Sequence, residues 1–129
     1  MPLFMVKLNS IFLTAFNWVS FNQDFPWDKL KKDSVICDVG GGVGSISTQL
    51  AKCYPTLRFI LQDLPGELEI AEHKVWPQRC PEAIQQKRIS FIPLNFFKES
   101  PEKGCDIYFV SVVCCKYLGY VISNQELIS

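Results

Sequence analysis

Four glycines stand within five positions from Gly40 to Gly44, just after the acidic residue Asp38. An apolar, β-branched stretch precedes this run and a helical pattern follows it, so the run falls where a strand passes into a helix. Glycine has no Cβ, which lets the backbone turn sharply and approach a ligand closely. A tight turn alone also uses glycine, but four glycines exceed that need. The run therefore predicts a nucleotide-binding site.

The spacing of the glycines separates the candidate nucleotides. A phosphate-binding P-loop needs a lysine directly after its last glycine, and Ser45 stands there. A dinucleotide site needs a third glycine three positions after the second, and that position falls on Ser45 or Ser47. What fits is acidic-x-Gly-x-Gly-x-Gly, the pattern of class I methyltransferases, whose acid suits a cofactor with an ammonium group. The pattern predicts S-adenosylmethionine, held by Asp38, Gly40, Gly41, Gly42 and Gly44.

Asp63 is a second candidate ligand, because it follows the next apolar stretch about twenty residues beyond the glycines. A carboxylate at this point can accept hydrogen bonds from both hydroxyls of a ribose. Dehydrogenases share the spacing, and a cap for the turn before Pro65 is an alternative role. Combined with the Asp38 pattern, the ribose role is the better interpretation.

The elements that must position these residues alternate between strands and helices. Apolar stretches predict four strands, at residues 34–39, 57–61, 89–93 and 106–113. Apolar spacing and proline positions predict helices at about residues 6–20, 43–53, 67–75 and 81–86. Pro77 is expected to break the third of these helices. Continuously apolar strands that alternate with helices favour an α/β fold with a parallel sheet covered on both faces.

Composition narrows the classes of function. The chain has 129 residues, enough for one small domain, and its 13 basic and 13 acidic residues cancel. A neutral chain gives no electrostatic reason to expect nucleic acid or an anionic membrane as partner. Residues 1–21 are mainly apolar, but they contain too many polar residues for a helix that spans a bilayer. No signal cleavage site follows them. We therefore expect a cytoplasmic protein without a nucleic-acid or membrane partner.

The six cysteines are interpreted as reduced thiols. Cys37 falls in an apolar strand pattern and Cys53 on the apolar side of a helix pattern, where thiols act as small hydrophobes. An even count leaves a disulfide framework as the alternative, but no secretion signal accompanies it. The chain has no Cys-x-x-Cys pair, and His73 is the single histidine, so no metal site is expected.

From about Phe25 to Phe109 the sequence resembles plant and fungal small-molecule O-methyltransferases of the caffeic acid O-methyltransferase-like family. Four ordered blocks carry the resemblance, at residues 35–44, 54–65, 88–97 and 104–109. The resemblance implies a partial Rossmann-like class I methyltransferase fold, with flanking helices and the strand order 3-2-1-4. It also implies that Leu64 lines the adenine pocket and that Asn95 and Phe96 flank the adenine. The family usually has aspartate at the position of Asn95, and asparagine keeps an acceptor oxygen.

The reaction implied is methyl transfer to a hydroxyl of a small, aromatic acceptor, and the chain departs from the family at the catalytic segment. The family's general base is a histidine, whose position falls on Cys115, and the positions after it fall on Lys116 and Tyr117. Loss of a general base costs about a hundred- to ten-thousand-fold in rate. The one candidate to replace the histidine as general base is a thiolate of Cys115. The alternative function is a non-catalytic cofactor-binding or dimer-modulating fragment of an O-methyltransferase.

Three segments are expected: an N-terminal helix or connector at 1–24, the cofactor-binding domain at 25–110 and a divergent tail at 111–129. Val110 and Ser111 are what a common splice-donor sequence encodes, so we interpret the tail as a translated intron or altered exon. With only these strands, the fourth would present an unpaired edge. The family's dimerisation domain is missing or reduced to the leading helix, which leaves dimer formation open. Two further, less favoured hypotheses are a fragment that does not fold and an NAD-dependent oxidoreductase.

Overall fold

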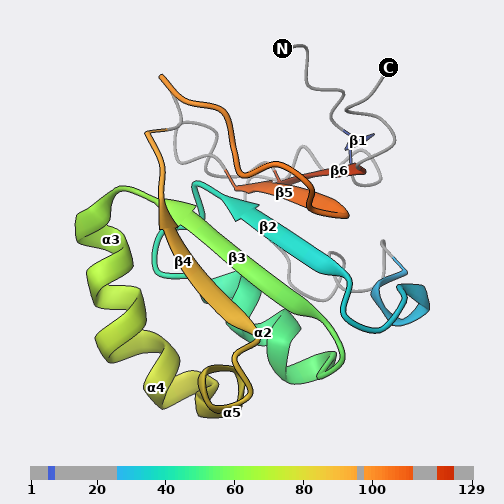
Figure 1. Ribbon diagram of the computed structural model, residues 1–129, viewed down its shortest axis with the longest axis horizontal. Helices are drawn as coiled ribbons and strands as arrows, with labels where there is room; N and C mark the ends of the chain where they lie inside the picture. Colours follow the sequence, from blue (N-terminus) through green and yellow to red (C-terminus); the bar gives the residue numbers. More distant parts are fainter. Residues whose placement is uncertain (1–5, 8–25, 96–97, 112–118, 124–129) are drawn as a thin grey trace.

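The computed structural model describes residues 6–7, 26–95, 98–111 and 119–123. In this part of the chain one sheet has the strand order β1-β6-β5-β2-β3-β4 (Figure 1). Its parallel strands are β2 (Val35–Val39), β3 (Arg58–Asp63), β4 (Ile89–Pro93) and β5 (Ile107–Ser111). The order β4-β3-β2-β5 confirms the predicted 3-2-1-4, and the strand bounds agree with the predicted ranges to within two residues at the ends described.

The expected unpaired edge of the fourth strand is wrong. Strand β6 (Gly119–Ser123) runs antiparallel to β5, and the short β1 (Val6–Lys7) runs antiparallel to β6. A returning strand satisfies the backbone N–H and C=O groups that an edge would otherwise expose. The sheet thus continues across the predicted division at residue 110. The helix expected over 6–20 is wrong at residues 6–7, and residues 8–20 lie outside the described chain.

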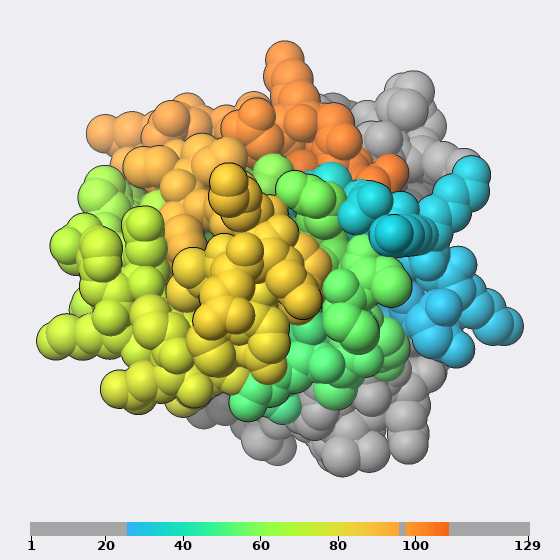
Figure 2. All heavy atoms as spheres, turned by 60° about the horizontal axis from the view of Figure 1, so that its bottom comes forward, coloured from blue at the N-terminus to red at the C-terminus, as the bar shows by residue number. Residues whose placement is uncertain are grey.

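Side chains alternate between the two faces of the sheet, and all the described α-helices cover one of them. These helices are α2 (Ser45–Cys53), α3 (Pro65–Ile70), α4 (Trp76–Arg79) and α5 (Pro81–Gln85). Their buried residues pack on Ile36, Phe59, Leu61 and Ile107 of the strands. Figure 2 turns this helical side forward, and α2 and α5 lie there next to each other. A separate buried cluster on the other face contains Cys37, Val39, Leu94, Cys105 and Tyr108.

The expected break at Pro77 is also wrong. Helix continues from α3 through the π-helical turn η2 (Ala71–Val75) into α4, where Pro77 occupies the first turn. The missing N–H of a proline is tolerated best at such a position. The helix ends at Cys80, and Pro81 begins α5 as predicted.

Cysteine placement agrees with the prediction in part. Cys37, Cys53, Cys80 and Cys105 are free thiols, and Cys37 is buried in β2. Cys53 is exposed, contrary to the expectation, because it is the last residue of α2 and the covered face of that helix consists of earlier residues.

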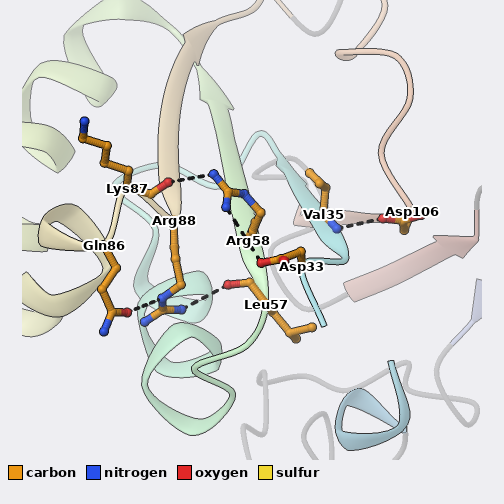
Figure 3. Close-up of polar contacts among 8 residues, drawn as sticks. All are labelled: Asp33, Val35, Leu57, Arg58, Gln86, Lys87, Arg88 and Asp106. Carbon is orange, nitrogen blue, oxygen red and sulfur yellow. Dashed lines mark hydrogen bonds and ion pairs between the residues drawn. The ribbon is translucent and has the colours of Figure 1, made fainter. Parts of the chain in front are cut away.

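A buried guanidinium joins α2 to the segments after α5 and before β3, and Figure 3 shows its contacts with Gln86 and Leu57. Arg88 is 7% exposed. Its Nε donates to Gln86 Oε1 at 2.7 Å, and its Nη1 donates to the Leu57 carbonyl at 3.1 Å and the Ala51 carbonyl at 3.4 Å. Because Leu57 immediately precedes β3 and Ala51 belongs to the last turn of α2, Arg88 fixes the amino ends of the strands. This is the edge of the sheet opposite the glycine run.

Candidate functional site

The glycine run forms the connection from the carboxyl end of β2 to the amino end of α2. Gly42 and Gly44 have φ angles of 62° and 85°, in the left-handed region that favours glycine. The Gly40 N–H donates to the Gln62 carbonyl at 2.8 Å, which ties the turn to β3. The Gly44 N–H donates to the Gly41 carbonyl at 3.0 Å and closes the turn before α2 begins.

Asp38 lies in β2 directly before this turn, and its carboxylate is buried. Its side chain is on the helical face of the sheet, and the residue is 1% exposed. Neither carboxylate oxygen has a hydrogen-bond partner among the described residues. The nearby Ser47 hydroxyl donates to the Gly44 carbonyl at 3.4 Å. A buried, unpaired carboxylate is costly, because burial removes the hydration of its charge.

This burial changes the proton affinity of Asp38. The pKa of its carboxyl is raised from 3.8 to about 7: burial raises it most, the nearby Ser47 hydroxyl lowers it in part, and the negative charge of Asp63 adds a smaller increase. The Asp38 carboxyl is therefore poised to ionise when a positive charge comes close, since an opposite charge favours the ionised form.

Gly41 and Gly42 differ in the space around the position where a Cβ would lie. A Cβ on Gly41 would lie 2.3 Å from Asp38 Oδ1, so only glycine lets the turn pack on this carboxylate. A Cβ on Gly42 would meet no atom of the described residues within 4 Å. The first glycine is thus required by the protein's own packing, and the second presents bare backbone to open space.

Asp63 ends β3 beside the same turn. Its Oδ2 accepts the Gly42 N–H at 2.7 Å and its Oδ1 accepts the Leu64 N–H at 2.7 Å. The helix cap before Pro65, which the sequence left open as an alternative, is not formed, because α3 begins without a side-chain cap and the Oδ1 contact is with the N–H of the next residue only. Each carboxylate oxygen has a second lone pair, so Asp63 retains capacity for two further donors. Asp63 therefore positions Gly42 and can still accept ligand hydroxyls.

The remaining predicted residues lie further along the same edge of the sheet or outside the described chain. Leu64 follows β3 and is 52% exposed. Asn95 follows β4, where its N–H donates to Glu99 Oε1 at 2.8 Å, and the Leu94 N–H joins this segment to the Asp63 carbonyl at 2.9 Å. Phe96 and Cys115 lie outside the described residues.

Trp76 is a residue of this region that the sequence pattern missed. It is fully buried, and its indole Nε1 donates to the carbonyl of Val43, within the glycine turn, at 3.2 Å. Its position directly before Pro77 was interpreted as the end of a helix. The signal that could have found it is the spacing of apolar residues at 68, 71 and 76, which fits a helix with one wide turn.

The residues present fit S-adenosylmethionine. This molecule carries an ammonium group, a carboxylate and two ribose hydroxyls. The orphaned Asp38 carboxylate suits the ammonium, the bare backbone at Gly42 leaves room for the ligand, and Asp63 suits the hydroxyls. In the described part of the chain, no group of three or more His, Cys, Asp or Glu side chains is placed to hold a metal ion. No helix among the described residues is long and apolar enough to cross a membrane.

Comparison with known proteins gives consistent matches. The O-methyltransferase domain family matches residues 20–119, beyond both ends of the predicted resemblance. The chain is 44% identical over 113 residues to the O-methyltransferase tpcA of Aspergillus fumigatus, which covers 88% of this chain and 22% of tpcA. The chain spans about a fifth of the length of the curated relatives it matches.

Two solved structures show the same fold. The mitomycin 7-O-methyltransferase MmcR matches with a TM-score of 0.52 and 28% identity, over 63% of this chain and 22% of MmcR. The structure of LepI in complex with SAM matches with a TM-score of 0.50 and 30% identity, over 67% of this chain and 22% of LepI. The chain therefore belongs to the O-methyltransferase domain family of S-adenosylmethionine-dependent methyltransferases.

Proposed function

We propose that this chain binds S-adenosylmethionine at the carboxyl ends of β2 and β3, as the cofactor-binding part of an O-methyltransferase. The observation that carries the proposal is the Asp38 carboxylate, which is 1% exposed and whose two oxygens have no hydrogen-bond partner in the described part of the chain. A fold tolerates a buried, unpaired carboxylate when a ligand supplies the opposite charge. Carboxylates whose pKa is strongly shifted by burial are typical of functional sites.

Each residue of the site has a proposed role. Asp38 faces the ammonium group of the cofactor, and the turn backbone at Gly42 lies against its methionine end. Asp63 accepts the ribose hydroxyls while it continues to hold the Gly42 N–H. Leu64, half exposed in this structure, packs on the adenine, and Asn95 supplies an acceptor oxygen beside it.

The proposed reaction is transfer of a methyl group to a hydroxyl of a small aromatic compound. The cofactor supplies an electrophilic methyl group on sulfur, and catalysis requires the acceptor oxygen to be held in line with it. The described residues form the cofactor side of such a site. In the family pattern the general base falls on Cys115, where no histidine stands.

That replacement favours a second candidate function, a chain that binds the cofactor without catalysing transfer or that pairs with a longer relative. The two candidates differ in turnover. Purified chain is incubated with methyl-labelled S-adenosylmethionine and a panel of phenols, and binding is measured by calorimetry in parallel. Labelled product supports the enzyme, whereas binding without product supports the non-catalytic module.

A pair of glycine variants tests the site itself. Gly42→Val places a side chain in the open space beside the turn, and we expect it to abolish cofactor binding. Gly104→Val is the matched control, because Gly104 also has a positive φ, 84°, and open space around its Cβ position. Gly104 precedes β5 at the opposite edge of the sheet, so its variant carries the same backbone strain away from the site. Equal affinity of the Gly42 variant and the control would refute the assignment.

A further inference from the structure

The indole of Trp76 lies directly behind the glycine turn. Its Nε1 donates to the Val43 carbonyl at 3.2 Å, and its ring meets the ring of Phe91 edge to face, with centroids 6.0 Å apart and planes at 83°. The residue is 0% exposed, so this position is fixed by packing on all sides. Val43 lies between Gly42 and Gly44 in the glycine turn. Trp76 therefore connects α4 directly to this turn.

The π-helical turn η2 explains how Trp76 reaches this position. The buried residues of this helix are Leu68, Ala71 and Trp76, separated by three and then five positions. A regular α-helix returns to the same face after three or four residues, which would place residue 75 there instead. The wider turn over Ala71–Val75 takes up the extra residue and turns Trp76 inward. Such π turns are frequent at functional sites.

The indole also limits what residue 44 can be. A Cβ on Gly44 would lie 2.7 Å from Trp76 Nε1 and 3.1 Å from Leu61 Cδ2. The backbone of the turn therefore rests on the indole with no space between them. A hydrogen bond and a close steric contact act on two consecutive residues of the turn, and both come from one side chain.

From this geometry, and resting on the proposed function, we infer that Trp76 is a positioning residue that holds the glycine turn in its cofactor-binding conformation. Trp76 does not face the ligand side of the turn, where Gly42 is open, and acts through Val43 and Gly44. Without the indole donor the turn samples other positions. The measured affinity is then the affinity of the binding conformation multiplied by the fraction of molecules that keep it.

Trp76→Phe in the full chain tests this inference, because it keeps an aromatic ring against Phe91 and removes the N–H donor. The matched control is Trp27→Phe. Trp27 is buried in the same cluster but lies before β2, at the opposite end of the strand from the turn. We expect both variants to unfold at lower urea concentration. Only Trp76→Phe should weaken S-adenosylmethionine binding, by about threefold to tenfold, the effect of losing one neutral hydrogen bond.

Hydrogen exchange of the turn amides in the unliganded chain gives a readout that does not need the cofactor. We expect Trp76→Phe to speed exchange at Gly42 and Gly44, and Trp27→Phe to leave it unchanged. If the wild-type chain fails to bind S-adenosylmethionine while this difference is present, the proposed function fails and the positioning role stands. Unchanged exchange and affinity in Trp76→Phe, or equal changes in both variants, would overturn the inference.

A second variant covers the case in which Trp76→Phe does not fold. Benzothienylalanine at position 76 replaces the indole N–H by sulfur and keeps the size of the ring system. We expect a folded chain with the same faster exchange at the turn. Wild-type exchange in this variant would show that the donor has no role in positioning.

Discussion

Replacement of Asp38 by asparagine keeps the size of the side chain and removes its charge. We expect Asp38→Asn to be more stable than the wild type above pH 7 in the absence of ligand, although the residue belongs to the proposed binding site. In the wild type, the ionised Asp38 carboxylate is buried, and no described residue forms a hydrogen bond with it. The variant removes this charge, so the free energy of unfolding rises.

The magnitude follows from the shift in proton affinity. The pKa of the Asp38 carboxyl is raised from 3.8 to about 7, chiefly by burial. Between these two values the folded chain holds a proton that the unfolded chain has released, so the stability of the wild type falls as the pH rises. Above pH 7 both forms are ionised and the loss is complete. A shift of about 3 pH units corresponds to about 4 kcal/mol.

Urea unfolding from about pH 4 to about pH 8 measures this effect, because the linkage predicts stability as a function of pH. We expect the wild-type free energy of unfolding to fall across this range relative to that of Asp38→Asn. Asp28→Asn, which changes an exposed carboxylate, controls for the loss of one acidic residue. Parallel pH profiles for the wild type and Asp38→Asn would refute the reasoning.

The same charge links stability to binding. A cationic ligand pairs with the ionised form of Asp38, so a proton must leave before the ligand binds below pH 7. We expect cofactor affinity to fall by up to about tenfold per pH unit below pH 7, and Asp38→Asn to remove this part of the pH dependence. Calorimetry in buffers of different ionisation enthalpy detects the released proton.

Three further variants or treatments test the packing of the glycine turn and of the rest of the fold. Gly41→Ala places a Cβ 2.3 Å from Asp38 Oδ1, so we expect about 1–3 kcal/mol of destabilisation in urea and weaker cofactor binding; a wild-type urea midpoint would contradict this. Arg88→Met removes the buried donors to two backbone carbonyls, and we expect about 3 kcal/mol of destabilisation, whereas Arg88→Lys should lose less. Cys53 should react with iodoacetamide in the folded chain and Cys37 only after unfolding, as peptide mass mapping will show; early labelling of Cys37 would contradict its burial.

Local sequence patterns were sufficient for the central part of the fold. Apolar β-branched stretches predicted β2 to β5 and their parallel direction, because burial on both faces demands continuously apolar strands, whereas the order of the strands was predicted from the family resemblance. The glycine run and Asp63 were predicted to meet, and they do, because the carboxyl ends of neighbouring parallel strands lie at one edge of the sheet. The sequence signals behind these predictions each lie within a short stretch of the chain.

Other features depend on contacts between distant residues. The antiparallel pairing of β6 with β5, and of β1 with β6, corrected an expected open edge and part of an expected helix. A two-residue strand has no periodic signal of its own, because its conformation comes from the partner it pairs with. Likewise, the break expected at Pro77 ignored the π turn, which is stabilised by packing on the sheet rather than by helix propensity.

The sequence by itself determined which residues form the glycine turn and which chemistry their types permit. Only the tertiary structure decided that Asp38 is buried without a partner among the described residues and that Trp76 lies behind the turn. The physical reason is that burial and hydrogen-bond geometry depend on how elements pack together. That packing brings Trp76 against Val43, which lies 33 positions away in the chain. A local sequence pattern cannot predict a contact between residues so far apart.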